Sequence, residues 1–276
     1  MKKLYTLIIA ATVAATASAQ GVLPTVEQPL AQITQNPGLT GIIHSWGFVG
    51  DSLSSGELES RDDNGKIGFN DFYEYSWGQR LCQATGAKGD NYSQGGETAK
   101  GWIANFWDNP ANKNNNIDAK LSPKQAYIIA LGVNDFWTHA ALGDSTDINL
   151  SDYTKNADTF IGNYAGIIQR LKTLEPRAKF FVVTIPRNGT KTYEFNDAIR
   201  LMAKVFDNTY VIDLEKYGPS YEPGSEIEQN YYVGTHLSAA GYQLTAWIMM
   251  NYIDWIIRHN MEDFKQVGFI GTDLKY

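Results

Sequence analysis

Ser52, in the stretch FVGDSLSSGE at residues 48–57, is a candidate nucleophile. A serine hydroxyl becomes reactive when a neighbouring base removes its proton and when N–H donors stabilise the oxyanion that its attack produces. Glycine, aspartate and serine are also common turn residues, so this tripeptide alone does not distinguish a nucleophile from a turn. The question is therefore whether the chain supplies a base and oxyanion donors at positions that a fold would bring to Ser52.

Three residues elsewhere in the chain could supply these groups: Gly96 in SQGGETAKG, Asn134 in LGVNDFW and His236 in YYVGTHLSAAGY. Glycine lets a backbone N–H approach a substrate closely, the asparagine amide is a donor, and histidine can accept and return a proton near neutral pH. Taken alone, each is more often a turn residue or a polar residue at a helix start. Together they predict an oxyanion hole made by the N–H groups of Ser52 and Gly96 and by the Asn134 amide, with His236 as the base.

The elements that must position these residues are indicated by apolar runs that alternate with segments of helical period. This pattern predicts an α/β fold with a five-stranded parallel sheet covered by helices on both faces. The expected strands are residues 45–50, 89–93, 126–132, 179–185 and 209–214. Ligands of such sheets bind beyond the carboxyl ends of the strands. Every candidate residue lies just after a predicted strand or just before the last predicted helix.

Apolar residues at spacings of three and four predict helices over residues 160–171 and 195–206. Ser238 is the expected N-cap of a long last helix that is apolar on most sides and therefore buried. Two polar, turn-rich stretches, residues 105–120 and 139–152, are expected to be surface loops. They either form walls of a substrate site or only face solvent.

The N-terminal stretch MKKLYTLIIAATVAATASAQ combines lysines, an apolar segment and Ala-Ser-Ala, the pattern of a signal peptide. We expect cleavage after Ala19, which would place the mature protein outside the cytoplasm, either secreted or periplasmic. A membrane anchor is the alternative, but the apolar segment is shorter than a span requires. Residues 20–276 contain no linker or break in composition, so we expect a single domain with no membrane span.

The charge and the metal-binding residue types exclude several function classes. The chain has 23 basic and 30 acidic residues, a balance that repels phosphate backbones and argues against a nucleic-acid partner. Cys82 is the only cysteine, so no internal disulfide can form. The four histidines are far apart and lack zinc-ligand spacing, so we expect neither a metal nor a cofactor.

The four blocks around the candidate residues resemble the SGNH (GDSL) hydrolases in residue type, order and spacing. In that family the blocks carry a Ser, a Gly, an Asn and a His, which correspond to Ser52, Gly96, Asn134 and His236. The resemblance extends from the first predicted strand to the last predicted helix. It implies a flavodoxin-like three-layer sandwich and ester hydrolysis through an acyl-enzyme. The longer stretches GDSLSSGE, YSWGQRL and YIDWII are similar to secreted enzymes of gut Bacteroidetes.

The chain departs from the family pattern at Val233, because the family usually has an aspartate three residues before its histidine. A main-chain carbonyl could orient the imidazole instead, and we predict such a Ser52–His236 dyad. Carboxylates that could serve as a third member are Asp213, Glu226 and Glu228. A further alternative is a weakened site that serves as a glycan-binding module.

The predicted activity is that of a secreted serine esterase that removes a small acyl group, most simply O-acetyl, from a carbohydrate. The expected partner is thus a small-molecule or glycan ester. Hydrolysis of lipid or other acyl esters is the enzymatic alternative. Trp137, which follows Asn134 closely, is predicted to line the substrate cleft, with a packed core tryptophan as the other interpretation.

Overall fold

A parallel sheet forms the centre of the computed structural model, which describes residues 28–36, 38–108 and 121–274. Its strands are β1 (Ser45–Gly50), β4 (Lys88–Ser93), β5 (Ala126–Ala130), β6 (Lys179–Val183) and β7 (Thr209–Ile212). Their order is β4-β1-β5-β6-β7, with every neighbouring pair parallel. This is the flavodoxin-like order, so the predicted fold class is confirmed.

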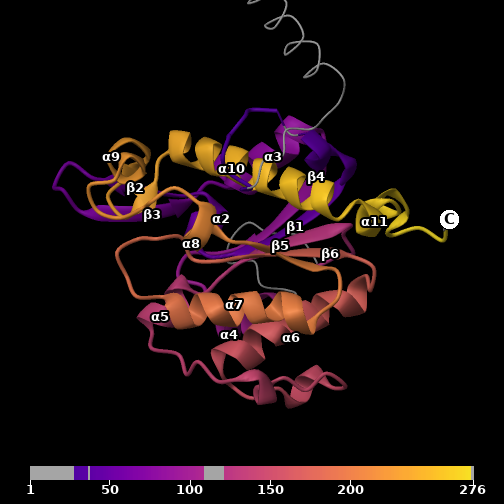
Figure 1. Cartoon of the computed structure of the whole chain (residues 1–276). Helices are drawn as coiled ribbons and strands as arrows, with labels where there is room; N and C mark the ends of the chain where they lie inside the picture. Colours follow the sequence, from indigo (N-terminus) through magenta and orange to yellow (C-terminus); the bar gives the residue numbers. More distant parts are fainter. Residues whose placement is uncertain (1–27, 37, 109–120, 275–276) are drawn as a thin grey trace, which may run out of the picture.

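Helices cover both faces of the sheet and complete the three layers (Figure 1). One face is covered by α3 (Trp77–Thr85) and α10 (Ala239–His259), and the other by α4 (Ala99–Trp102), α6 (Phe160–Leu174) and α7 (Tyr193–Val205). The expected helices are thus present, and the Ser238 side chain caps α10 by accepting the Gly241 N–H at 3.2 Å.

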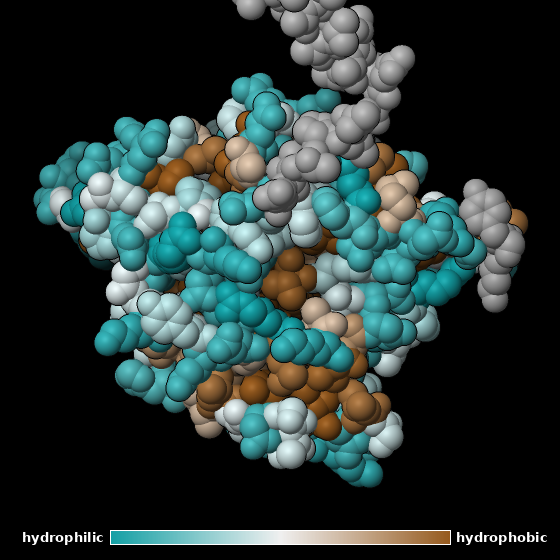
Figure 2. All heavy atoms as spheres, viewed as in Figure 1, coloured by the Kyte–Doolittle hydropathy of each residue, from teal (hydrophilic) through white to brown (hydrophobic). Residues whose placement is uncertain are grey.

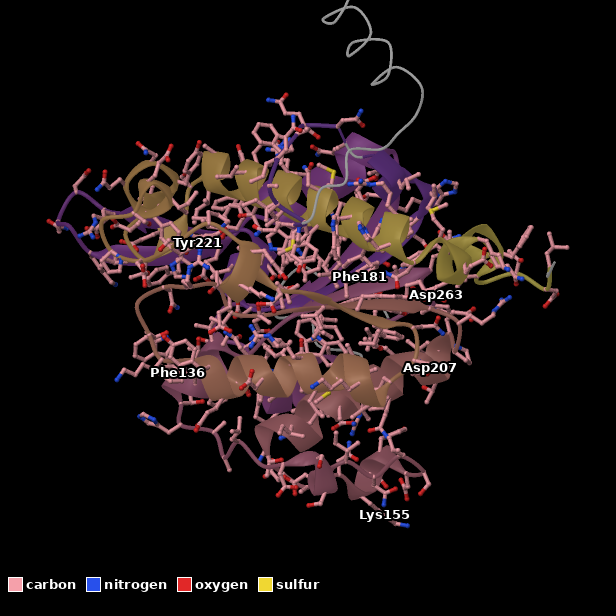
Figure 3. All side chains as sticks on the ribbon, in the orientation of Figure 1. Phe136, Lys155, Phe181, Asp207, Tyr221 and Asp263 are labelled. Carbon is pink, nitrogen blue, oxygen red and sulfur yellow. The ribbon has the colours of Figure 1, made fainter. Side chains whose placement is uncertain are left out.

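The two cores reflect the alternation of side chains along each strand. Phe48 of β1 and Phe181 of β6 belong to the core under α3 and α10, whereas Val49 and Phe180, their chain neighbours, belong to the core under α6 and α7. Figure 3 shows Phe181 on the α10 side of the sheet. These residues are almost completely buried, and burial of each large apolar side chain contributes about 2 kcal/mol to stability.

Short elements complete the chain, and two small antiparallel sheets were not predicted from the sequence. The hairpin sheets are β2 (Glu57–Arg61) with β3 (Ile67–Asp71), and β8 (Tyr232–Val233) with β9 (His236–Leu237). The remaining short helices are α2 (Ser52–Ser55), α5 (Val133–Trp137), α8 (Leu214–Tyr217), α9 (Glu226–Tyr231) and α11 (Met261–Phe264). Single helical turns are η1 (Gly38–Ile42), η2 (Tyr73–Tyr75), the π-helical η3 (Ile103–Trp107), η4 (Ser145–Asp147), η5 (Tyr153–Lys155) and η6 (Val267–Phe269).

The predicted loops and the N-terminal segment are only partly described. Residues 105–107 belong to η3, whereas residues 109–120 and the predicted signal peptide, residues 1–19, lie outside the described residues. Residues 139–152 form a loop that includes η4 and pairs its backbone with the start of α6. On the face seen in Figure 2, hydrophilic residues predominate, and apolar residues gather mainly in one area in the lower part of the view. Among the described helices, none is long and apolar enough to cross a membrane.

Tyr242 connects α10 to the segment that follows β1. Its side chain is fully buried, and its hydroxyl oxygen lies 2.7 Å from the carbonyl oxygen of Glu57 and 3.2 Å from that of Ser52. One O–H is therefore shared between two carbonyls, and it holds the helix that follows His236 against the turn that carries Ser52.

We expect Tyr242→Phe to lower the free energy of unfolding by about 1–3 kcal/mol, because it leaves two carbonyls without this buried donor and keeps the ring. Urea titration followed by circular dichroism measures the effect. Tyr210→Phe is the matched control, since its hydroxyl bonds to Asp263 at an exposed position and its loss should cost less than about 0.5 kcal/mol. An unchanged urea midpoint for Tyr242→Phe would contradict the proposed connection.

Candidate active site

The predicted site residues all lie on segments at the carboxyl ends of the central strands or just before α10. Ser52 begins α2 directly after β1, Gly96 follows β4, Asn134 lies in α5 after β5, and His236 begins β9. In space, α2 packs against both β4 and β9. The fold therefore brings the serine-bearing turn and the histidine-bearing hairpin together at one edge of the sheet.

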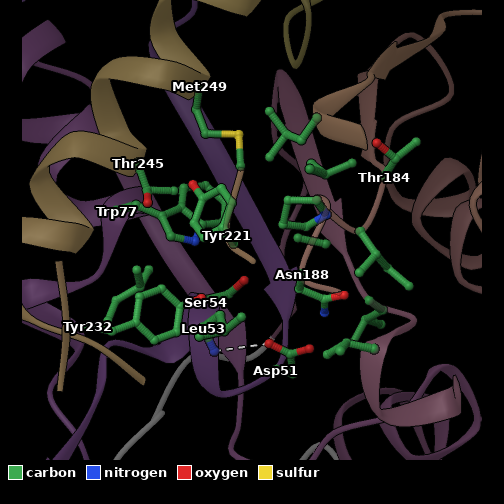
Figure 4. A pocket seen from close by; sticks show the side chains of 18 residues that line it. Asp51, Leu53, Ser54, Trp77, Thr184, Asn188, Tyr221, Tyr232, Thr245 and Met249 are labelled. Atoms are coloured by element: carbon green, nitrogen blue, oxygen red, sulfur yellow. Dashed lines mark hydrogen bonds between the residues drawn. The ribbon is translucent and has the colours of Figure 1, made fainter. Parts of the chain in front are cut away.

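The turn that carries Ser52 is held by side chains and backbone groups on either side of it. Asp51 is the N-cap of α2, and its carboxylate accepts the Leu53 N–H at 3.0 Å (Figure 4). Asn91 of β4 donates its amide to the carbonyl of Ser54 at 2.8 Å. Ser52 itself is partly exposed, and its hydroxyl has no hydrogen-bond partner within the described ranges. The hydroxyl is thus presented on a fixed turn.

Gly96 and Asn134, the two other candidates for oxyanion donors, are linked through the segment that follows β4. Gly96 has a φ of 74°, which favours glycine, and its exposed N–H has no acceptor in the part of the chain that the structure describes. The Asn134 side chain donates to the carbonyl of Glu97 at 3.0 Å. An asparagine amide has two N–H bonds, so this contact orients the group and leaves one donor for a ligand.

Two buried aspartates, Asp51 and Asp135, hold the loops that carry the candidate site residues. Asp135 accepts the N–H of Ala99 at 3.1 Å, which ties α5 to the start of α4, and burial raises the pKa of Asp135 to about 6. Burial raises the pKa of Asp51 to about 7. The Asp51 side chain borders a mainly apolar pocket that Ile185 also lines, and Met249 lies on its far side in Figure 4. This apolar surrounding explains why the charged form of Asp51 is disfavoured.

Among the described residues, the His236 ring makes its hydrogen bonds to side chains and none to a main-chain carbonyl. Its Nε2 lies 2.9 Å from Oε1 of Glu57, and its Nδ1 lies 3.0 Å from the hydroxyl of Thr235. The ring of Phe69 lies beside the imidazole, with 5.1 Å between ring centroids. Glu59 accepts the N–H of Thr235 at 2.9 Å and so fixes the turn before His236. The predicted main-chain orientation of the imidazole is therefore not what the structure shows.

None of the carboxylates considered from the sequence contacts His236. Asp213 is bound to Arg200, with 2.8 Å between Oδ1 and Nη2, and this pair joins the end of β7 to α7. Glu226 and Glu228 lie in the first turn of α9, where Glu228 accepts the N–H of Gly224 at 3.1 Å. Sequence reasoning overlooked Glu57, although it lies in the same GDSLSSGE stretch as Ser52.

Trp137 lies on the surface, with 59% of its area exposed, so it is not a packed core tryptophan. Its ring packs edge-on against Phe136, which in turn packs against Phe195 of α7. Figure 3 places Phe136 beside α5 and the start of α7. The exposed indole, three residues after Asn134, is thus packed on one side against Phe136. Within the described residues, no group of His, Cys, Asp and Glu side chains could hold a metal ion.

The raised pKa of Asp51 predicts how stability changes with pH. The folded state retains the proton up to about pH 7, whereas the unfolded chain loses it near 3.8, so stability falls as pH rises between these values. In Asp51→Asn, the decrease in unfolding free energy between about pH 5 and 7.5 should be smaller by about 1–3 kcal/mol. Urea titrations at both pH values measure this difference. Equal decreases in both proteins would contradict it.

Comparisons with known proteins identify the family and the fold. Residues 48–244 match the sequence model of the GDSL-like lipase/acylhydrolase family. No protein with a curated function matches the sequence. A protein described as a GDSL-like lipase from Bacteroides uniformis is 16% identical, with a TM-score of 0.52 over 80% of this chain and 96% of that one.

Two carbohydrate esterases of family two also share the fold. The enzyme from Corynascus thermopiles is 14% identical, with a TM-score of 0.54 over 78% of this chain and 67% of that one. An active-site mutant of the Clostridium thermocellum enzyme is 16% identical, with a TM-score of 0.53 over 79% of this chain and 64% of that one. Identities this low show a common fold only. The match to the family model covers more than half of the chain, which therefore belongs to the GDSL-like lipase/acylhydrolase family and is a serine esterase of the SGNH type.

Proposed function

We propose that this esterase removes small acyl groups, most simply O-acetyl groups, from a carbohydrate outside the cytoplasm, through an acyl-enzyme on Ser52. The observation that carries the proposal is the arrangement of Ser52, Gly96, Asn134 and His236 on segments that meet at one edge of the sheet. That arrangement provides a nucleophile, oxyanion donors and a base in a chain of the acylhydrolase family.

Acylation begins when the Ser52 hydroxyl attacks the ester carbonyl and its proton passes to the imidazole of His236. The new C–O bond converts the carbonyl into a tetrahedral oxyanion. The N–H groups of Ser52 and Gly96 and the free N–H of Asn134 are the donors for that oxygen, each worth about 3–4 kcal/mol of barrier. Because Glu97 already orients the Asn134 amide, little reorganisation is needed.

Collapse of the intermediate breaks the bond to the alcohol, which leaves with the proton that His236 returns. A water molecule then attacks the acyl-enzyme, giving its proton to His236, and the acid product leaves as Ser52 regains a proton. In the resting site the His236 ring makes its hydrogen bonds to Glu57 and Thr235, and none to the Ser52 hydroxyl. The contact for proton transfer therefore forms with substrate in place, as is common for catalytic hydrogen bonds.

The carbohydrate and the short acyl group are supported by the surroundings of these residues. Two aromatic side chains are exposed here: Trp137, three residues after Asn134, and Phe69, whose ring lies beside His236. Aromatic side chains commonly line ligand sites, and these two could pack against a sugar ring. The apolar pocket is lined by Asp51, Leu53 and Ser54 but not by Ser52, which argues against its use for a long acyl chain on Ser52. The N-terminal pattern supports export.

Ser52→Ala should reduce kcat on p-nitrophenyl acetate by roughly a thousandfold or more, because the variant cannot form the acyl-enzyme. A fluorophosphonate probe should label the wild-type protein and not the variant. Ser60→Ala, which removes an exposed hydroxyl on the neighbouring hairpin, is the control and should retain activity and labelling. Hydrolysis by Ser52→Ala at the wild-type rate would refute the assignment of the nucleophile.

Acyl-chain preference tests the substrate class. We expect kcat/KM to fall from p-nitrophenyl acetate through butyrate to octanoate, because the apolar pocket is not lined by the nucleophile. Release of acetate from an acetylated polysaccharide, measured with an enzyme-coupled acetate assay, tests whether the alcohol part of the ester is a carbohydrate. A preference for octanoate, or activity on lipid esters without release of acetate from the polysaccharide, would exclude the carbohydrate deacetylase.

A further inference from the structure

The hairpin β2–β3 follows directly after the turn that carries Ser52, and its first residue places a carboxylate beside His236. Glu57 is the first residue of β2, and its Oε1 lies 2.9 Å from Nε2 of His236. We propose that Glu57 is the carboxylate partner of His236 in this enzyme and provides the function of the acid that is absent at Val233. The proposal rests on the proposed roles of Ser52 and His236.

Burial makes this contact more effective than an exposed one would be. The side chains of His236 and Glu57 are 14% and 13% exposed, so water screens their interaction only weakly. A carboxylate that accepts the Nε2 hydrogen fixes the tautomer and leaves the lone pair on Nδ1. The Thr235 hydroxyl, 3.0 Å from Nδ1, can donate to that lone pair. Both contacts of the ring are therefore compatible with the same tautomer, in which Nε2 carries the hydrogen.

The surrounding backbone is shaped to hold the Glu57 carboxylate in this position. Gly56, with a φ of 82°, ends α2 and turns the chain into β2, and the Tyr242 hydroxyl bonds to the Glu57 carbonyl at 2.7 Å. A Cβ atom at Gly95 would lie 2.3 Å from Oε2 of Glu57. The carboxylate thus occupies space that exists because residue 95 has no side chain, beside the oxyanion candidate Gly96.

Other acidic residues face His236, but each has a different partner. Glu59 binds the backbone and hydroxyl of Thr235, Asp71 accepts the hydroxyl of Ser55, and Asp51 caps α2. Each of the three carboxyl groups, when ionised, attracts a positive charge on His236. Among the described residues, Glu57 is the carboxylate in hydrogen-bond contact with the ring, which distinguishes it from the others.

Glu57 acts on the reaction through His236 and does not take up a proton itself. When Ser52 gives its proton to Nδ1, the ring nitrogen that does not face Glu57, the Thr235 hydroxyl gives up its contact with that nitrogen. The imidazole then becomes a cation with two N–H bonds. One of these N–H bonds points to the Glu57 carboxylate, which stabilises the cation until the other proton passes to the leaving alcohol. Glu57 is therefore a positioning residue.

Glu57→Gln tests the proposal, because it removes the charge and keeps the size of the side chain. We expect kcat on p-nitrophenyl acetate to fall by roughly 10²–10⁴-fold with KM changed less than about threefold. The acid limb of the kcat/KM profile should move to lower pH, because the cationic imidazole loses its counter-ion while Asp51, Glu59 and Asp71 remain. A purely structural role would not produce that displacement.

Two further variants complete the test. Glu74→Gln removes the same charge at an exposed position shortly after β3, and it should leave kcat and the pH profile unchanged. Glu57→Asp keeps the charge on a shorter side chain, so it should lose kcat but retain the wild-type acid limb. This variant keeps the proposal falsifiable if Glu57→Gln does not fold, because a displaced acid limb in Glu57→Asp would contradict it.

The outcomes separate this proposal from the proposed function. If wild type is active, Ser52→Ala is inactive, and folded Glu57→Gln retains kcat within about threefold with an unchanged profile, the esterase stands and the role of Glu57 is refuted. An increase in kcat in Glu57→Gln would also refute it, since Glu57 would then restrain the ring. A wild-type protein that hydrolyses no ester would overturn both proposals.

Discussion

The shared hydrogen bond of the Tyr242 hydroxyl is the interaction on which the geometry of the site depends. Tyr242 is 190 residues from Ser52 in the chain and 185 residues from Glu57, yet its hydroxyl lies between their carbonyl oxygens. The tyrosine belongs to the first turns of α10, which begins just after His236. Anchoring α10 at this point therefore sets the separation between the base, the nucleophile and the hairpin. A protein interior is packed too densely for these segments to shift independently.

Several acidic side chains lie near His236 at the site edge of the sheet. They lower the stability of the folded state and favour the reaction. Burial raises the pKa values of both Asp51 and Asp71, so each of these carboxyl groups costs folding free energy at neutral pH. During ester hydrolysis the same negative potential favours the cationic form of His236. Functional sites commonly retain interactions that reduce stability in this way.

Much of the fold followed from the sequence because its signals are local. The runs that form β1, β5 and β6 are apolar on both faces, as expected for strands covered on both sides, and the resemblance placed the four site residues beyond them. Three strands end earlier than predicted, at Ala130, Val183 and Ile212. After Ala130 the chain turns toward the site through Gly132, with a φ of 129°. Apolar residues continue past these strand ends because they still face a core or pocket.

The hairpin and its contact with His236 could not be predicted in the same way. Its strands are mainly polar and have no fully buried residue, so they lack the clear apolar alternation that marks a half-buried strand. Asn64-Gly65 at the turn was the available signal, since this dipeptide favours hairpin loops. The contact between Glu59 and Thr235 joins residues 176 positions apart, and it depends on how the hairpin packs against β9. No local propensity encodes such a pairing.

The hairpin β2–β3 lies outside the central sheet and contributes no strand to it (Figure 1). Its length, twist and tip can therefore vary through insertion or exchange without disturbing the layers that hold Ser52, Gly96 and Asn134. An acid carried by such a peripheral hairpin can be exchanged separately from the histidine. An acid that lies next to the histidine in the chain cannot. Grafting or trimming this hairpin is thus a route by which protein engineers can retune the base while leaving the scaffold and the nucleophile intact.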